Sequence, residues 1–341
     1  MRRMAGVTDI VNLQSLIVPM RKTQPWSPAL KPVVEAEPDP ERGLPAEPRE
    51  GQTFAGQSLL VRYVNLVKLP HTVFALPFAL LGVVYASHET AVTVATAALV
   101  IVAFTAARFA AMGFNRIVDR RLDGKNPRTS GRELPMGRLS FGQAVMAVVV
   151  AGAIFVLCAG LLNPLCLALS PVALGWICAY SYTKRWTDWS HLWLGASLGI
   201  APVGGYLAVA GTWSEPAWTL LALAGAVATW VGGFDVFYAL QDEVFDRAQR
   251  LRSAVVRLGP ARSILLAKLG HGLTIALLML FGIGAGLGWI YYVGIAVATG
   301  LMVWEHQLVT PGDLSRLDAA FFTMNGVISA VVFLGALGDR L

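Results

Sequence analysis

The sequence has few charged residues, and this scarcity argues against a soluble fold. Only 14% of the 341 residues are Asp, Glu, Lys or Arg, whereas a soluble domain averages about 25%. Hydrophobic residues make up 55% of the chain and come in long runs. These features predict an all-α, polytopic membrane protein. The net charge is +6. The Lys and Arg residues lie in short loops between the apolar runs, so the charge indicates membrane topology rather than nucleic-acid binding.

Cysteine is also scarce, and the three cysteines stand apart from one another. Cys158, Cys166 and Cys178 lie inside apolar segments, and the sequence contains no CxxC pair. This spacing indicates neither a disulfide framework nor a zinc site.

Residues 1–57 lack the apolar runs of the rest of the chain. They are rich in Pro, Glu and Arg, as in the stretch VVEAEPDPERGLPAEPREGQ, and a segment of this composition cannot bury a core. The basic start is not followed by the apolar run and small-residue cleavage site of a secretory signal. We predict a disordered N-terminal extension over 1–57 and a transmembrane domain over 58–341.

Nine apolar segments follow this extension, each near the roughly 20 residues that span a bilayer. They cover 71–87, 91–114, 142–162, 164–182, 192–210, 217–238, 264–286, 288–305 and 319–337. Lys and Arg gather in alternate connections, so the positive-inside rule predicts that these loops and the N-terminus are cytoplasmic. We expect a multi-pass protein of the cell (inner) membrane.

Two acidic motifs stand at the ends of the second and sixth segments, on the predicted cytoplasmic face. The first, NRIVDRRLDGKNPRTSGR, places Asn115, Asp119 and Asp123 four residues apart, and residues at this spacing lie on one face of a helix. The second, DVFYALQDEVFDRAQRLR, repeats the spacing with Asp242 and Asp246. A single motif of this kind is often a solvated loop with helix caps. Its repetition favours a shared functional site.

The oxygen atoms of these motifs suit Mg²⁺, which takes one or two carboxylates and completes its coordination with water and phosphate oxygens. The predicted metal ligands are Asn115, Asp119, Asp123, Asp242 and Asp246. A diphosphate ester needs such cations, and Lys or Arg would neutralise its remaining charge. If the ester is allylic, its ionisation gives a cation that an electron-rich ring can attack. The apolar bundle would suit an isoprenoid tail.

Further polar residues fit the same site. Arg128 and Arg132 follow the first motif closely enough to hold the same anion, and Tyr238 stands in the second motif at the position that corresponds to Asn115. Tyr180 and Lys184 lie four residues apart at the end of the fourth segment. They either reach diphosphate oxygens or form an anchor pair at the membrane interface.

Arg108 and Asp235 are charged residues inside apolar segments. An intramembrane Arg costs at least about 2.5–3.5 kcal/mol and requires a compensating partner. Arg108 either snorkels to the membrane interface, pairs with Asp235 or binds the carboxylate of an aromatic substrate. Asp235 either pairs with Arg108 or takes the proton released when the ring regains aromaticity. The residues predicted to carry catalysis are Asp119, Asp123, Asp235, Asp242 and Asp246.

Two other functional classes use similar residues. In a membrane transporter, Arg108 and Asp235 would be coupling charges, but such groups usually lie near the midplane, whereas the acidic motifs fall at one face. Membrane CDP-alcohol phosphotransferases carry their Asp pairs in one compact motif, whereas here four apolar segments separate the two motifs. The pattern therefore argues against both classes.

At these residues the chain resembles the UbiA superfamily of intramembrane aromatic prenyltransferases. The family's first motif, NDxxDxxxD with an Arg-rich tail, is similar to NRIVDRRLDGKNPRTSGR, although Arg116 replaces the second-position Asp and is left out of the metal ligands. Its second motif, DxxxD with an upstream Asp, is similar to Asp235, Asp242 and Asp246. The resemblance implies nine transmembrane helices around a central cavity that opens laterally to lipid.

The resemblance also implies roles for individual residues. The five metal ligands named above would hold Mg²⁺ and diphosphate. The phosphate would be contacted by Arg128, Arg132, Tyr180 and Lys184. Arg108 would bind the carboxylate of the aromatic acceptor.

The stretches HTVFALPFALLG, AMGFNRIVDRR, RELPMGRLS and FDVFYALQDEVFD are most similar to the 4-hydroxybenzoate polyprenyltransferase group. They are closest to its branch linked to menaquinone made through futalosine, which is expected to prenylate a dihydroxynaphthoate. The predicted reaction is Mg²⁺-dependent transfer of a polyprenyl group from its diphosphate to a hydroxylated aromatic acid in quinone biosynthesis. Either acid is a candidate acceptor, and no protein or nucleic-acid partner is implied.

Overall fold

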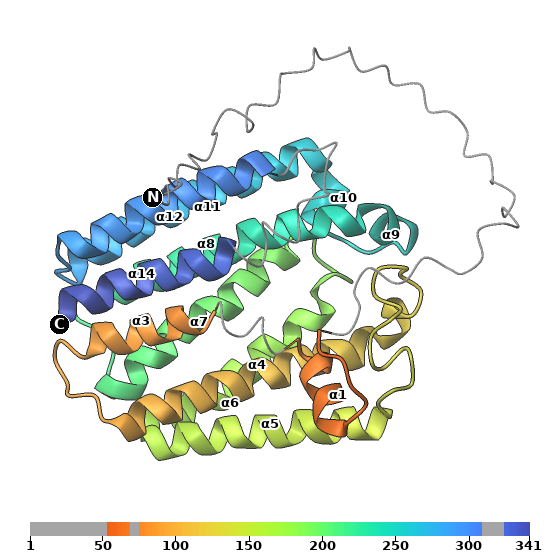
Figure 1. Cartoon of the computed structure of the whole chain (residues 1–341), viewed down its shortest axis with the longest axis horizontal. Helices are drawn as coiled ribbons and strands as arrows, with labels where there is room; N and C mark the ends of the chain where they lie inside the picture. Colours follow the sequence, from red (N-terminus) through yellow and green to blue (C-terminus); the bar gives the residue numbers. More distant parts are fainter. Residues whose placement is uncertain (1–52, 69–74, 309–323) are drawn as a thin grey trace, which may run out of the picture. The chain divides into compact units, whose positions relative to one another are not determined.

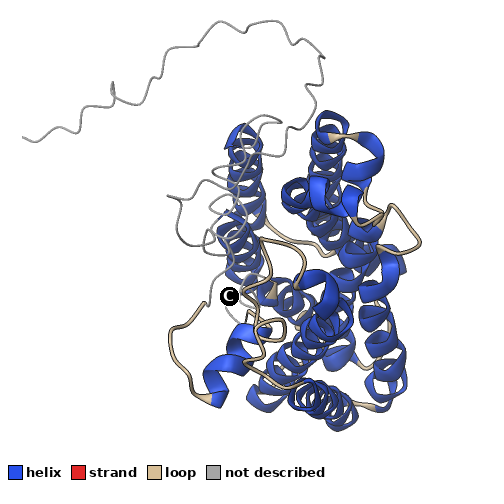
Figure 2. Ribbon diagram, turned by 90° about the vertical axis from the view of Figure 1, so that its right-hand side faces the viewer, coloured by secondary structure: helices blue, strands red, loops and turns tan. Residues whose placement is uncertain are grey.

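The structure is a computed structural model that describes residues 53–68, 75–308 and 324–341. Within these ranges the chain forms helices joined by loops and turns, without strands (Figure 2). The all-α prediction is therefore confirmed for this part of the chain. Residues 1–52 of the predicted extension, the start of the first predicted span and residues 319–323 of the ninth lie outside the described residues.

Each of the nine predicted apolar segments coincides with a helix (Figure 1). The helices are α1 (Leu59–Leu66), α3 (Leu76–Ala86), α4 (Val94–Asp123), α5 (Phe141–Leu162), α6 (Pro164–Thr183), α7 (Ser190–Ala210), α8 (Ala217–Ala239), the 3₁₀ turn η2 (Leu240–Asp242), α9 (Glu243–Ala248), α10 (Ala254–Leu258), α11 (Pro260–Gly284), α12 (Trp289–Leu308) and α14 (Asn325–Arg340).

Six helices in the described ranges have the length and composition to cross a membrane. They are α4, α5, α6, α7, α11 and the continuous run from α8 through η2 and α9. The remaining three apolar segments form α3, with 11 residues, α12, with 20, and α14, with 16. The protein is thus a multi-pass membrane protein, and a count of nine spans stays a prediction.

Local sequence signals set several helix ends. Ser140 accepts a hydrogen bond from the Gln143 amide, and the Gln143 side chain accepts one from the Ser140 amide, which forms a capping box at the start of α5. Asn163 alone separates α5 from α6. Its side-chain oxygen accepts a hydrogen bond from the Cys166 amide, and its nitrogen donates to the Leu207 carbonyl of α7, both at 2.8 Å. This single residue therefore joins three helices.

Contacts between neighbouring helices run from α3 through α4, α5, α6, α7, α8, α11, α12 and α14 and back to α3. Helix α3 also packs directly against α7. The contact between α7 and α8 is close because Gly195 and Gly199 face the α8 backbone, where a methyl group on Gly199 would lie 2.7 Å from the Ala224 carbonyl oxygen. Small residues at a spacing of four allow membrane helices to approach in this way.

The main core lies between α3, α7, α8, α11, α12 and α14. Trp230 of α8 is fully buried, with its ring centroid 4.8 Å from that of Phe78 and 4.9 Å from that of Phe234. Within a bilayer such tight packing stabilises the fold by dispersion rather than by exclusion of water. The core thereby fixes the direction of α8, which carries the second acidic motif at its end.

Candidate functional site

The first acidic motif lies entirely on α4. Asn115, Asp119 and Asp123 occupy its last turns, and the Asn115 side-chain nitrogen donates to Asp119 Oδ2 at 3.0 Å. Asp123 is the last residue of the helix and is buried. The three side chains therefore form the predicted column.

The second motif departs from a regular helix. Tyr238 is near the end of α8, Asp242 closes the 3₁₀ turn η2 and Asp246 belongs to α9. The tighter turn changes the direction of the chain between the two carboxylates. Asp242 and Asp246 are both buried.

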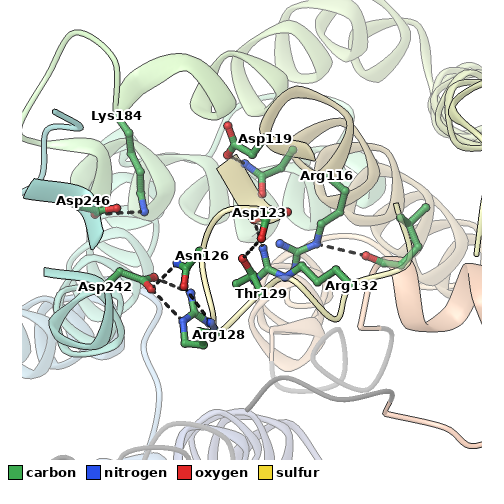
Figure 3. Close-up of polar contacts among 12 residues, drawn as sticks. Arg116, Asp119, Asp123, Asn126, Arg128, Thr129, Arg132, Lys184, Asp242 and Asp246 are labelled. Carbon is green, nitrogen blue, oxygen red and sulfur yellow. Dashed lines mark hydrogen bonds and ion pairs between the residues drawn. The ribbon is translucent and has the colours of Figure 1, made fainter. Parts of the chain in front are cut away.

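The loop after α4 connects the two motifs. Asn126 donates from its side-chain nitrogen to Asp242 Oδ1 at 2.9 Å. Arg128 donates from Nε to Asp242 Oδ1 at 2.9 Å, from Nη2 to Asp242 Oδ2 at 2.5 Å and from Nη1 to the Tyr238 hydroxyl at 3.0 Å. Figure 3 shows Asp242 and Asp246 on one side and Asp119 and Asp123 on the other, with Asn126 and Arg128 close to Asp242. The two motifs therefore meet in space.

The other carboxylates of the two motifs also face cations. Arg132 lies 2.6 Å from Asp123, Arg185 lies 2.8 Å from Asp119, and the Lys184 ammonium is 3.9 Å from Asp246. Burial alone would lower the pKa of the Lys184 ammonium, but the nearby carboxylates, above all Asp246, raise it above its ordinary value. Lys184 is therefore held in its charged form.

One polar cavity of about 220 Å³ is lined by every residue that the sequence analysis selected. These are Arg108, Asn115, Asp119, Asp123, Arg128, Arg132, Tyr180, Lys184, Asp235, Tyr238, Asp242 and Asp246. Lys68, Arg116 and Arg185 add to its positive charge, so seven Lys and Arg side chains face five Asp. Their excess positive charge suits an anionic ligand. The roles assigned to the individual residues stay predictions.

A second cavity, of about 230 Å³ and mainly apolar, adjoins the polar one. It lies between α4, α5, α6 and α7 and is lined by residues such as Phe104, Phe155 and Ile177. The residues that line both cavities are Arg108, Met112, Asn115, Tyr180, Leu194 and Leu198. A ligand with a charged head and an apolar tail could therefore occupy both.

The structure adds three polar residues that sequence reasoning did not select. Asn126 contacts Asp242, and Arg185 contacts Asp119. His191, the second residue of α7, places Nδ1 2.7 Å from Asp235 Oδ2 in the polar cavity. Asn126 and Arg185 lie in loops, where no periodicity marks a functional position, and His191 starts a helix far from either motif.

Magnesium was predicted for this site, and the side chains present fit it. In the described part of the chain, no three His, Cys, Asp or Glu side chains are grouped so as to hold a metal by themselves. However, Asp123 Oδ2 and Asp246 Oδ2 are buried oxygens without a hydrogen-bond partner in those ranges. Mg²⁺ binds through one or two carboxylates together with substrate phosphates, so a site completed by a diphosphate agrees with both observations.

Comparison with known proteins decides the family. Residues 75–327 match the UbiA prenyltransferase family. The chain belongs to this family. The chain is 31% identical over 227 residues to a 4-hydroxybenzoate octaprenyltransferase of Nitrosospira multiformis. The matched residues are 67% of this chain and 77% of that protein. A protein of the same name from Pseudomonas syringae is 29% identical over 282 residues, or 81% of this chain and 93% of its own.

Solved UbiA structures share the fold. The apo structure of a UbiA homologue from Aeropyrum pernix superposes with a TM-score of 0.73 at 32% identity, over 80% of this chain and 98% of that one. A UbiA homologue from Archaeoglobus fulgidus, bound to GPP and Mg²⁺, gives a TM-score of 0.61 at 18% identity over 82% and 99% of the two chains. This UbiA protein is therefore a prenyltransferase, which decides against the transporter.

Proposed function

We propose that this UbiA enzyme transfers a polyprenyl group from polyprenyl diphosphate to a hydroxylated aromatic carboxylic acid, with Mg²⁺ and within the membrane. The observation that carries the proposal is the pair of adjoining cavities, one rich in Asp, Arg and Lys and the other mainly apolar. Their common wall includes Arg108, Asn115 and Tyr180. The bond that breaks would lie near this wall.

The donor would bind with its diphosphate in the polar cavity and its isoprenoid tail in the apolar one. Arg128, Arg132, Tyr180 and Lys184 would contact the phosphate oxygens, with Tyr238 oriented by its hydrogen bond from Arg128. The solved Archaeoglobus fulgidus homologues bound to GPP and to DMAPP, each with Mg²⁺, support a prenyl diphosphate as ligand. Electrostatic stabilisation of a departing anion by fixed cations is a major source of rate enhancement.

Mg²⁺ would be held by Asp119, Asp123, Asp242 and Asp246 together with Asn115. When bound, the ion would supply positive charge to the leaving diphosphate. In the structure Arg128, Arg132, Arg185 and Lys184 neutralise these carboxylates. The same side chains can turn to the phosphate oxygens when a metal and a donor occupy the site. These cations would thus pair with the carboxylates before metal and donor bind and with the phosphate oxygens once both are bound.

The acceptor would lie beside Arg108 and Asp235, which both line the polar cavity. Arg108 would bind the carboxylate of the acid, and a planar guanidinium suits this group. Asp235 would accept the proton that the ring releases. The relatives named 4-hydroxybenzoate octaprenyltransferase support 4-hydroxybenzoate as the acceptor. A dihydroxynaphthoate presents the same phenol and carboxylate and is the second candidate, which places the reaction in either ubiquinone or menaquinone synthesis.

Membranes that contain the protein would test this proposal. They would receive one long-chain polyprenyl diphosphate, Mg²⁺ and either 4-hydroxybenzoate or a dihydroxynaphthoate, and chromatography would detect the prenylated acid. We expect product with one of the two acids and none after chelation of the divalent metal, with recovery when Mg²⁺ is restored. Absence of product with both acids, or product in chelator, would reject the proposal.

We also propose that the enzyme lies in the cell (inner) membrane with the polar cavity and the N-terminus on the cytoplasmic side, and that residues 58–341 form the catalytic domain. A protein that begins at residue 58 should keep the transfer activity of the full chain. Thiol labelling of a Cys introduced at Lys125, in the loop after α4, should occur only from the cytoplasmic side. Labelling from the opposite side would reverse the orientation.

A further inference from the structure

The buried His191 and the partly exposed Asp235 form a pair in the lining of the polar cavity. His191 is the second residue of α7 and Asp235 lies near the end of α8. A distance of 2.7 Å separates Nδ1 of the ring from Oδ2 of the carboxylate. The imidazole is 2% exposed, whereas 16% of the Asp235 side chain is exposed. Asp235 is therefore the member of the pair that a substrate in the cavity can reach.

The packing of α7 on α8 holds this pair in place. Gly195, one helical turn after His191, lies so close to α8 that a methyl group there would collide with the Ala228 carbonyl. The next small residue on the same face, Gly199, is in similar contact with Ala224. The two helices cannot separate without loss of these contacts, so the distance between His191 and Asp235 is fixed by backbone packing.

The hydrogen bond to Asp235 determines which ring nitrogen of His191 carries a proton. A carboxylate accepts hydrogen bonds only, so Nδ1 of a neutral ring donates its proton to Asp235 and Nε2 carries the lone pair. Nε2 is buried and has no hydrogen-bond partner within the described ranges. A donor on one oxygen fixes the orientation of a carboxylate.

We propose that His191 is a positioning residue that orients Asp235 as the base for the acceptor ring; this inference rests on the proposed function. In the reaction, the bond between the prenyl carbon and the diphosphate oxygen breaks, and the diphosphate keeps the electron pair. The ring carbon next to the phenol carbon bonds to the prenyl carbon. That ring carbon then gives its proton to Asp235, and the electrons of the broken C–H bond restore the aromatic ring. His191 keeps the carboxylate aimed at this proton.

Three variants separate positioning from proton transfer by the ring itself. His191→Asn retains an N–H donor near the place of Nδ1 but has no basic nitrogen. His191→Gln places its amide nearer to the place of Nε2. His191→Leu removes both functions. A positioning role predicts that His191→Asn stays within a few fold of wild-type kcat, whereas His191→Leu falls about 10- to 100-fold.

The assay uses the full-length protein in membranes with geranylgeranyl diphosphate, Mg²⁺ and the acid on which the wild type is active. It compares kcat, KM for the donor and the rate with acceptor deuterated at the ring carbons beside the phenol carbon. In His191→Leu we expect an unchanged donor KM and a larger slowing by deuterium than in wild type, because loss of the ring proton becomes rate-limiting. A merely structural effect would lower kcat without changing the isotope ratio.

Equal loss of activity in His191→Asn and His191→Leu would overturn the positioning role and point to the ring as the base. Wild-type turnover in His191→Leu would also overturn it. If His191→Leu does not fold, greater activity of His191→Asn than of His191→Gln supports the inference, and the reverse order overturns it. A wild-type enzyme that prenylates neither acid would instead refute the proposed function, and this inference with it.

Discussion

Arg128 and Asp242 lie 114 positions apart in the chain, yet the guanidinium holds the carboxylate through two hydrogen bonds of 2.9 and 2.5 Å. The same guanidinium lies 5.0 Å from the centre of the Tyr238 ring. This contact joins the loop after α4 to the end of α8. It brings the two acidic motifs to one cavity.

Replacement of Arg128 should weaken donor binding. Arg128→Lys keeps the charge but loses the planar fork, so it should raise KM for the prenyl diphosphate by about 10-fold, and Arg128→Ala by about 100-fold, since hydrogen bonds to charged groups contribute roughly 1.5–3 kcal/mol. Steady-state kinetics in membranes would measure this. Arg257→Ala is the control, because the exposed Arg257 pairs with Asp188 outside the cavity. An equal effect of Arg257→Ala would exclude a specific role.

Loss of either acidic motif should abolish turnover. Asp119→Ala and Asp242→Ala should each lower kcat by more than about 100-fold, because each removes a predicted metal ligand on a different side of the cavity. Asp188→Ala should keep wild-type activity. Thermal unfolding in detergent would establish that the variants are folded. Substantial activity in both Asp variants would reject the metal-site assignment.

Arg108→Ala should change KM for the acceptor but not KM for the donor. The guanidinium is predicted to bind the acceptor carboxylate, so its removal should raise KM for the aromatic acid by about 10- to 100-fold and leave KM for the donor nearly unchanged. Arg120→Ala, also on α4 but exposed and stacked over Phe141, should change neither constant. A larger effect on the donor would remove the assigned role.

The close packing of α7 on α8 should be sensitive to a single methyl group. Gly199→Ala places a carbon 2.7 Å from the Ala224 carbonyl oxygen, so the helices must shift, at a cost of about 1–3 kcal/mol in the free energy of unfolding. Gly175→Ala on α6 is the matched control, because a methyl group there meets no atom within 4 Å. Chemical unfolding in detergent would compare the two. Equal stability would contradict the packing described for α7 and α8.

The sequence by itself determined the class of the fold and most of the cavity lining. Long apolar runs with few charges can only be helices within a bilayer, and each predicted segment coincides with a helix. The spacing of Asn115, Asp119 and Asp123 fixed their common face because α4 continues through all three. These features depend on local periodicity, which a sequence records directly.

Only the tertiary structure decided which side chains complete the cavity. Asn126 and Arg185 reach the carboxylates from loops, and a loop has no repeat from which the direction of a side chain can be inferred. His191 meets Asp235 because α7 and α8 pack through glycines, and that distance depends on contacts between segments far apart in the chain. The 3₁₀ turn that ends at Asp242 likewise interrupts the regular helix that the repeated spacing predicts. Local spacing thus sets what each helix presents, and packing between helices sets what those side chains meet.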